Sequence, residues 1–141
     1  MDLKQLRTEV DSIDEEILAL LNRRMEFTLR TRKLKTVVEE PQREQEIIAR
    51  IRTRSSRLIS PELSERLFLE IIGESKRLQS EKRTLVGFQG EHGAFSEMAI
   101  RSVFPDAVPI PHGDFRSVFE GVENGVLDRG VVPVENSVAG N

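Results

Sequence analysis

The apolar residues of the first half of the chain recur with the spacing of a long helix. From Asp2 to Glu40 there is neither glycine nor proline, and Asp2 with Gln5 three residues later is typical of a capping box at a helix start. Steps of three and four separate the apolar residues and define one helix face. We therefore predict a first helix of about 35 residues, roughly 50 Å long at 1.5 Å per residue. Its apolar face holds Leu3, Leu6, Val10, Ile13, Ile17 and Leu20, continued by Phe27 and Leu34.

Two shorter helices follow, and each has a recognisable start. Pro41 is tolerated in a first helical turn, and the segment after it is apolar at helical spacing until about Ser55. Ser60 followed by Pro61 is an N-cap and first-turn signal. The third helix keeps its apolar spacing until about Lys82. The first half is therefore predicted to be a three-helix domain.

The pattern changes after residue 84, where eight of the nine glycines lie. Apolar runs predict strands at 85–89, 107–110 and 129–134, and helices at 94–104 and 114–122, the second capped by Asp114. This alternation predicts the opening of an α/β domain with a parallel sheet. We place the domain boundary between Glu81 and Thr84. The chain is thus predicted to be mainly α, with a helical domain at 1–83 and a partial α/β segment at 84–141.

Charge and composition narrow the classes of function. Residues 1–83 carry a net charge of +2 and residues 84–141 one of −5, and the total of −3 argues against a general nucleic-acid binder. Without cysteine there is no disulfide, thiolate zinc site or cysteine nucleophile. No apolar run approaches the length of a membrane span, and the N-terminus lacks the apolar core of a secretory signal. We expect a cytoplasmic protein that binds neither nucleic acid nor a membrane.

The predicted first helix is too long for its own domain. A compact domain of the size of residues 1–83 has a radius of gyration of roughly 12 Å. Two short helices cannot cover an apolar face of about 50 Å. A partner chain packed along this face would cover it, which favours an interlocked, coiled-coil-like homodimer. A frayed or bent first helix is the alternative.

Polar side chains occupy positions that the helical pattern assigns to the core. Arg24 and Lys35 continue the apolar face of the first helix, Glu44 lies on the apolar face of the second, and Ser75 and Gln79 lie on that of the third. Burying several charges without compensation costs many kcal/mol. The region is therefore either a solvated bundle end with structural ion pairs or a site that awaits a ligand. Two cations, a carboxylate, an amide and a hydroxyl suit a small dianion that also bears a hydroxyl.

Four stretches of the helical half, in this order and spacing, resemble the small all-α chorismate mutases. They are LRxxVDSIDEEILALLNRR from Leu6, KLK at Lys33–Lys35, PQRE at Pro41–Glu44 and ESKRLQ at Glu74–Gln79. The resemblance covers residues 1–83 and implies an enzyme that converts chorismate to prephenate by a pericyclic Claisen rearrangement. It also implies an intertwined homodimer whose long first helices are shared, and a reaction without a metal or another cofactor.

The resemblance further implies which residues bind the two substrate carboxylates. Arg7 and Arg24 would bind one each, with Arg43 in support and Ser75 as a further donor. Arg7 and Arg24 are 17 residues apart in sequence, which is about 25 Å along a helix. They cannot bind one small ligand from the same straight helix, so Arg7 of the partner subunit would join Arg24. For Arg7, an ion pair with Asp11 one turn later is the alternative.

Lys35 and Gln79 would stand on either side of the substrate's ether oxygen, where negative charge develops as the bond breaks. Glu44 would accept a hydrogen bond from the ring hydroxyl. Glu40 stands where the family usually has an aspartate, so its side chain is one methylene longer. The chemistry needs orientation and electrostatic stabilisation but no nucleophile. A non-catalytic helical dimerisation or regulatory module of a shikimate-pathway enzyme is the alternative for this domain.

Two stretches of the second half, GFQGEHGAFSEMA from Gly87 and GVVPVENSVAG from Gly130, resemble the first signature stretches of prephenate dehydratase. That enzyme acts on the product of the mutase reaction, so the fusion would serve phenylalanine biosynthesis. The family's later Thr-Arg-Phe motif is absent, and we expect residues 84–141 to be a truncated segment that is inactive alone. We expect His92 and His112 to be solvated loop residues outside any metal site. In a complete domain the cleft would be lined by Phe95, Ser96, Glu135, Asn136 and Ser137.

Overall fold

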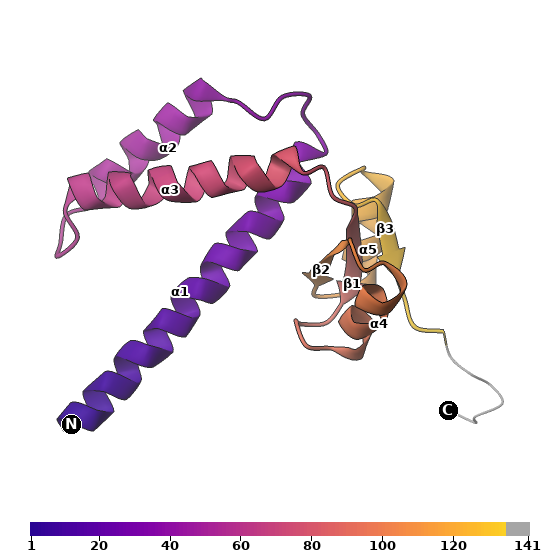
Figure 1. The fold of residues 1–141 in the computed structure, drawn as a ribbon, viewed down its shortest axis with the longest axis horizontal. Coiled ribbons are helices and arrows are strands. Elements are labelled where there is room, and N and C mark those ends of the chain that lie inside the picture. The colour runs from indigo at the N-terminus through magenta and orange to yellow at the C-terminus, as the bar shows by residue number, and fades with distance from the viewer. Residues whose placement is uncertain (135–141) are drawn as a thin grey trace. The chain divides into compact units, whose positions relative to one another are not determined.

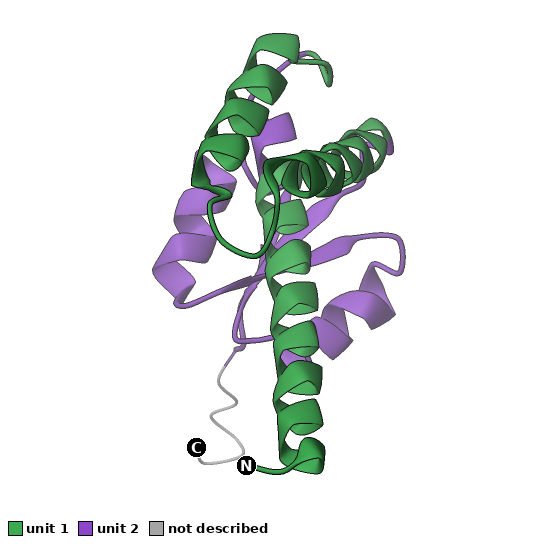
Figure 2. Ribbon diagram, turned by 90° about the vertical axis from the view of Figure 1, so that its left-hand side faces the viewer, with its two compact units in different colours: residues 1–29, 37–80 green, residues 30–36, 81–141 purple. Residues whose placement is uncertain are grey.

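The structure is a computed structural model that describes residues 1–134 and forms two compact units (Figure 2). The first unit holds residues 1–29 and 37–80, and the second holds residues 30–36 together with the chain from Glu81 onward. The segment 30–36 thus belongs to the second unit although its neighbours in sequence belong to the first. None of the described helices is long and apolar enough to cross a membrane.

Three helices build the N-terminal part of the chain (Figure 1): α1 (Leu3–Arg32), α2 (Pro41–Arg54) and α3 (Pro61–Ser80). α2 packs against α3, and the pair buries Ile47 and Ile72. At the end of α2, the hydroxyl of Ser55 donates to that of Ser64 at 2.6 Å. The three predicted helices are therefore present, with their starts close to the predicted positions.

The helix starts follow the capping signals in the sequence. The Asp2 carboxylate accepts a hydrogen bond from the Gln5 backbone N–H at 2.8 Å, and the Gln5 side chain accepts one from the Asp2 N–H at 2.7 Å. This reciprocal pair is the predicted capping box. Pro41 occupies the first turn of α2, and the Ser60 hydroxyl accepts from the Leu63 N–H at 3.1 Å at the start of α3.

α1 is shorter than the sequence predicts. It ends at Arg32, whereas the apolar face was predicted to continue to Leu34, whose side chain is 67% exposed. The N–H of Lys33 bonds to the Arg30 carbonyl at 3.1 Å, and that of Lys35 bonds to the Arg32 carbonyl at 3.4 Å. Bonds to the residue three positions back tighten the chain beyond the α-helical turn. The α-helix therefore ends at Arg32, and a tighter turn follows it.

Nothing in the described residues 1–134 covers the apolar face of the first twenty residues. α1 is one continuous helix of 30 residues, so its apolar face is not interrupted by a break in the helix. Every residue from 1 to 20 is exposed, and Leu6, Val10, Ile13 and Ile17 are each at least half exposed. A contiguous exposed apolar face of this kind is typical of an interaction surface.

The second unit contains a three-stranded parallel sheet in the order β2-β1-β3, as the alternating pattern predicts. The strands are β1 (Leu85–Gln89), β2 (Val108–His112) and β3 (Arg129–Val131), and the connections contain α4 (Phe95–Val103) and α5 (Phe115–Glu123). The Asp114 carboxylate accepts from the Ser117 N–H at 2.7 Å, which is the predicted cap of α5.

Both faces of the central strand β1 are covered, because successive residues of a strand point to opposite faces. Val86 and Phe88 are fully buried in a core that includes Ile100 of α4. On the other face, a Cβ added at Gly87 would come within 2.5 Å of the Leu127 side chain. This unit therefore has its own small core.

β3 ends at Val131, three residues before its predicted end. β3 pairs with β1 only along Val86–Phe88, and β1 ends at Gln89 before Gly90, whose φ is +130°. Pro133 lacks the N–H that a longer ladder needs. β3 therefore ends because β1 offers no further residues for pairing and because Pro133 cannot donate a hydrogen bond.

Candidate active site

Arg24 and Ser75 meet between α1 and α3. One guanidinium nitrogen of Arg24 donates to the Ser75 hydroxyl at 3.2 Å. Ser75 is 6% exposed, and its hydroxyl also lies 3.1 Å from the Ile71 carbonyl, an acceptor within its own helix. The serine can therefore donate to Ile71 while it accepts from the arginine. Two of the sequence-predicted site residues, 51 positions apart, thus come together in the interior of the first unit.

Gln79 lies one turn further along α3 and is the most buried of the predicted site residues, at 4% exposure. Its amide nitrogen donates to the Thr28 backbone carbonyl of α1 at 2.7 Å. Because an amide is planar, this bond fixes the direction of both its nitrogen and its oxygen. Gln79 is thus a fixed polar group on the face of α3 that its spacing assigned to the core.

Glu44 of α2 pairs with a residue that the sequence reasoning missed. The Lys76 ammonium lies 2.8 Å from one oxygen of Glu44 and 3.3 Å from an oxygen of Glu39. The hydrogen bond to Glu44 is the main cause that raises the pKa of Lys76, and it outweighs the lowering by burial. Lys76 directly follows Ser75 in the ESKRLQ stretch, but it lies off the apolar line that drew attention to Ser75 and Gln79.

Arg24 lies near two further arginines, both of which are exposed. Burial lowers the pKa of Arg24, and the nearby charges of Arg43 and Arg50 lower that pKa further. Arg43 and Arg50 are two turns apart on α2, so they share a helix face. Arg50 was not predicted as a site residue, although its seven-residue spacing from Arg43 is visible in the sequence. Cations that raise one another's free energy are stabilised by an anion placed among them.

The remaining predicted residues lie elsewhere. Arg7 is exposed near the start of α1, about 25 Å along the helix from Arg24. Glu40 is the residue before α2 and does not cap it with its side chain. Lys35 lies in the turn after α1, within the second unit, and its backbone carbonyl accepts from the Arg32 guanidinium at 2.6 Å. The first unit by itself thus brings only some of the predicted site residues close together.

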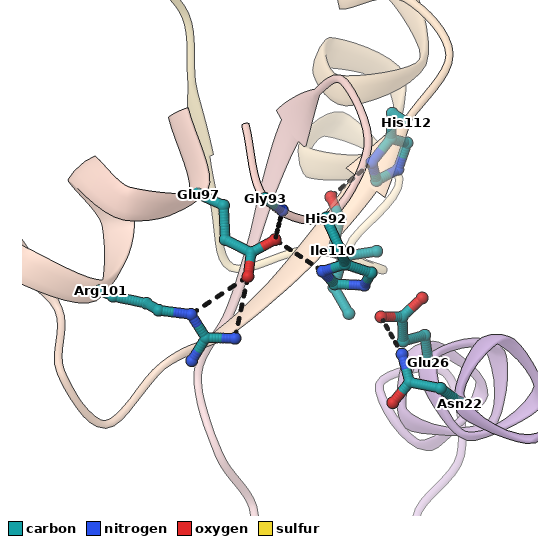
Figure 3. Close-up of polar contacts among 8 residues, drawn as sticks. All are labelled: Asn22, Glu26, His92, Gly93, Glu97, Arg101, Ile110 and His112. Carbon is teal, nitrogen blue, oxygen red and sulfur yellow. Dashed lines mark hydrogen bonds and ion pairs between the residues drawn. The ribbon is translucent and has the colours of Figure 1, made fainter. Parts of the chain in front are cut away.

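A second polar cluster lies around the loop between β1 and α4 (Figure 3). The buried carboxylate of Glu97 bonds to the His92 ring at 2.6 Å, to the Gly93 N–H at 3.3 Å and to the Arg101 guanidinium at 3.0 and 3.1 Å. Burial acts to raise the pKa of Glu97, but the bonds to His92, Arg101 and Gly93 outweigh it, and the pKa is lowered. His92 is an exposed loop residue, as expected, and its ring also bonds to Glu97 in the first turn of α4.

His112 differs from its expectation. It ends β2 instead of lying in a loop, and its Nδ1 is 3.0 Å from the Ile110 carbonyl (Figure 3). Its Nε2 is 3.4 Å from the Arg30 guanidinium. Since arginine only donates, Nε2 accepts and Nδ1 carries the hydrogen. Within residues 1–134, His, Asp and Glu side chains form no group of three that could hold a metal ion.

The predicted dehydratase residues are only partly described. Phe95, at the start of α4, is 89% exposed, and Ser96 beside it is partly buried. Glu135, Asn136 and Ser137 lie outside the described residues. Their predicted place in a cleft stays a prediction.

Each half of the chain matches a known protein family. Residues 6–80 match the family model of type II chorismate mutase, and residues 86–141 match that of prephenate dehydratase. The chain is 35% identical over 146 aligned positions to the bifunctional chorismate mutase/prephenate dehydratase of Aquifex aeolicus, covering 99% of this chain and 40% of that protein. The bifunctional protein of Pseudomonas aeruginosa is 33% identical, with 98% and 40% covered. The chain thus spans about two fifths of the length of these relatives.

Among solved structures, the chorismate mutase of Helicobacter pylori in complex with prephenate matches with a TM-score of 0.52 and 30% identity. The match covers 57% of this chain and 91% of that one. The helical half is therefore a chorismate mutase domain, and the part of a prephenate dehydratase domain follows it. By its helices and by its sequence, this chain belongs to the type II chorismate mutase family.

Proposed function

We propose that this protein catalyses the Claisen rearrangement of chorismate to prephenate, in phenylalanine biosynthesis in the cytoplasm. The observation that carries the proposal is the partly buried contact of Arg24 with Ser75, next to the fixed amide of Gln79, in a domain of the chorismate mutase family. Chorismate is a dianion, and a partly buried guanidinium with hydroxyl and amide donors beside it suits such a ligand.

The proposed site is shared by two chains. The uncovered apolar face of α1 supports a homodimer in which the long first helices pack together. Arg24 binds one carboxylate with Ser75 and Arg43 beside it, and Arg7 of the partner subunit binds the other. Because the two arginines of one site belong to different chains, the distance of about 25 Å between Arg7 and Arg24 on one helix does not prevent them from binding the same ligand.

The proposed mechanism is orientation combined with electrostatic stabilisation. The substrate is held in a compact conformer in which the two reacting carbons are close. The entropy of ordering the substrate is therefore lost on binding and not in the reaction step. As the carbon–oxygen bond breaks, the ether oxygen gains negative charge, and Lys35 and Gln79 donate to it. These donors stabilise the transition state more than the ground state. Glu44 and Glu40 lie on the side that accepts the ring hydroxyl.

The second half supplies part of a dehydratase domain that would act on prephenate. We infer that the described strands and helices form the beginning of that domain. A dehydratase activity of the whole protein would consume the product of the mutase reaction.

The test is the loss of chorismate's ultraviolet absorbance in the presence of the purified chain. We expect turnover by the wild type and a loss of about a hundredfold or more in kcat for Gln79→Ala, since one oxyanion donor contributes about that much. Gln42→Ala is the matched control, because Gln42 is an exposed amide in the first turn of α2. A wild-type chain that leaves chorismate unchanged would favour a non-catalytic helical module instead.

A further inference from the structure

Lys76 of α3 and Glu44 of α2 form an ion pair across the interface of these two packed helices, within the first unit (Figure 1). The Lys76 ammonium lies 2.8 Å from Oε1 of Glu44, and the two side chains are 30% and 25% exposed. Ile47 lies one turn after Glu44 and Ile72 one turn before Lys76, and both are buried. The ion pair therefore lies beside the apolar contact of α2 with α3 and is partly shielded from water.

The backbone of Glu44 is fixed by the start of α2, and its side chain is fixed by Lys76. The Glu44 N–H donates to the Glu40 carbonyl at 3.0 Å, in the first turn of the helix. Within residues 1–134, Lys76 is the one side chain that pairs with the Glu44 carboxylate. Oε1 of Glu44 is buried, so the exposed part of the side chain belongs to its other atoms. Lys76 thus directs one carboxylate oxygen into the interior and leaves the other able to accept from a ligand.

Lys76 has a second carboxylate within reach, and that contact is the weaker one. An oxygen of Glu39 lies 3.3 Å from the ammonium, but the Glu39 side chain is 68% exposed and precedes α2. Water screens an exposed ion pair more than a partly buried one. The contact of Lys76 with Glu44 is therefore the one that orders both side chains, and it does not require the charge of Glu39.

We propose that Lys76 is a positioning residue for chorismate binding, which directs the Glu44 carboxylate toward the ring hydroxyl of the substrate. The inference rests on the proposed function of Glu44 as the acceptor of that hydroxyl. Lys76 directly follows Ser75 and precedes Gln79 by three residues, so the three side chains project from the same stretch of α3. Lys76 therefore acts at the edge of the proposed site through Glu44, without touching the substrate.

The nature of this contact predicts which kinetic constant changes. The ring hydroxyl is neither formed nor broken in the rearrangement, so its hydrogen bond to Glu44 is present in the bound substrate and in the transition state alike. An interaction that stabilises both states equally lowers KM and leaves kcat unchanged. Loss of the positioning lysine should therefore raise KM, whereas a general loss of folded protein would lower the apparent kcat.

The experiment measures KM and kcat for chorismate in Lys76→Met, which removes the charge and keeps much of the side-chain length. We expect KM to rise about tenfold with kcat changed less than about twofold, since a hydrogen bond to a charged group contributes at least about a factor of ten. Lys76→Arg keeps a cation and should restore most of the lost affinity. Glu44→Gln combined with Lys76→Met should raise KM no further than Glu44→Gln alone, because the lysine acts through this carboxylate.

Two controls separate positioning from helix packing and from charge. Arg52→Met is the matched control, because Arg52 also links α2 to α3, at 3.6 Å from Glu62 and 3.7 Å from Glu65. Glu39→Gln removes the second carboxylate beside Lys76 and keeps the first. Both controls should leave KM and kcat unchanged.

The outcomes distinguish this inference from the proposed function. An active wild type whose KM is unchanged in Lys76→Met would overturn the inference alone. Effects of Lys76→Met and Glu44→Gln that add in the double variant would also overturn it, because the lysine would then act independently of the carboxylate. An equal rise in KM in Arg52→Met would assign the effect to helix packing and overturn it as well. An inactive wild type would overturn the proposed function, and this inference with it.

Discussion

The guanidinium of Arg24 reaches the buried hydroxyl of Ser75 across the interface of α1 and α3, at 3.2 Å. This contact places a charge at a position of α1 that continues its apolar face. The charges of Arg43 and Arg50 stand near enough to disfavour it. A partly buried cation with two further cations near it is better suited to binding an anion than to stability alone. The proposed chorismate site follows from this relationship.

Lys35→Ala should lower kcat a hundredfold to a thousandfold, since it removes a donor to the developing charge on the ether oxygen. Its thermal unfolding should match that of the wild type, because Lys35 is a partly exposed residue of a turn. Steady-state kinetics and circular dichroism of the two proteins check both expectations. Lys4→Ala, at an exposed lysine of α1, is the control. Near-normal turnover by Lys35→Ala would contradict the mechanism.

Gln79→Glu should be active at acidic pH and lose activity as the pH rises. A neutral carboxyl donates as the amide does, whereas a carboxylate cannot. The site buries this side chain and presents the Thr28 carbonyl to it, so the charged form is disfavoured and the pKa of the introduced carboxyl is raised. The profile of kcat against pH should therefore fall with increasing pH in the variant but not in the wild type. An identical profile in both would remove Gln79 from the ether oxygen.

Glu97→Gln should destabilise the second unit. The carboxylate holds His92, Gly93 and Arg101 together, and losing such charged hydrogen bonds costs about 1–3 kcal/mol. Denaturant unfolding measures the loss. Glu120→Gln, at an exposed ion pair, should cost less than about 1 kcal/mol. Equal unfolding free energies for the two variants would show that the Glu97 cluster adds no stability.

The same cluster predicts a pH dependence of stability. The pKa of Glu97 is lower in the folded chain than its ordinary value. Its contribution is therefore fully present above the ordinary carboxyl pKa of about 4.3 and is lost as the pH falls through the folded value. Unfolding free energies measured from pH 7 downward should fall more steeply for the wild type than for Glu97→Gln. Parallel curves would contradict this assignment.

The sequence was sufficient to predict the helices and the parallel sheet, and it singled out two buried polar residues of α3. Ser75 and Gln79 stand out because a polar residue at a helical core position is visible without a structure. Lys76 and Arg50 were missed because they lie beside that line, where a charged residue is ordinary. The end of α1 at Arg32 was missed because local turn bonds, which no periodicity reports, replaced the helix.

The long-range contacts could not be predicted from the sequence either. The Lys33 ammonium lies 2.7 Å from the Asp128 carboxylate, although the two residues belong to different halves and nothing in either local pattern links them. The same holds for His112 and Arg30. In each case the pairing depends on which segments share a compact unit, and the charge reversal near residue 84 gave no sign that residues 30–36 would belong to the second one.

The central claim is a mutase site built from two chains, and mixing two inactive variants tests it most directly. Arg7→Ala and Lys35→Ala should each be nearly inactive as purified proteins. After joint unfolding and refolding, half of the dimers should be mixed and each should contain one intact site, so that about a quarter of the wild-type chorismate turnover returns. A mixture that stays as inactive as its two components would contradict a shared site, and full activity of Arg7→Ala alone would contradict the role of that arginine.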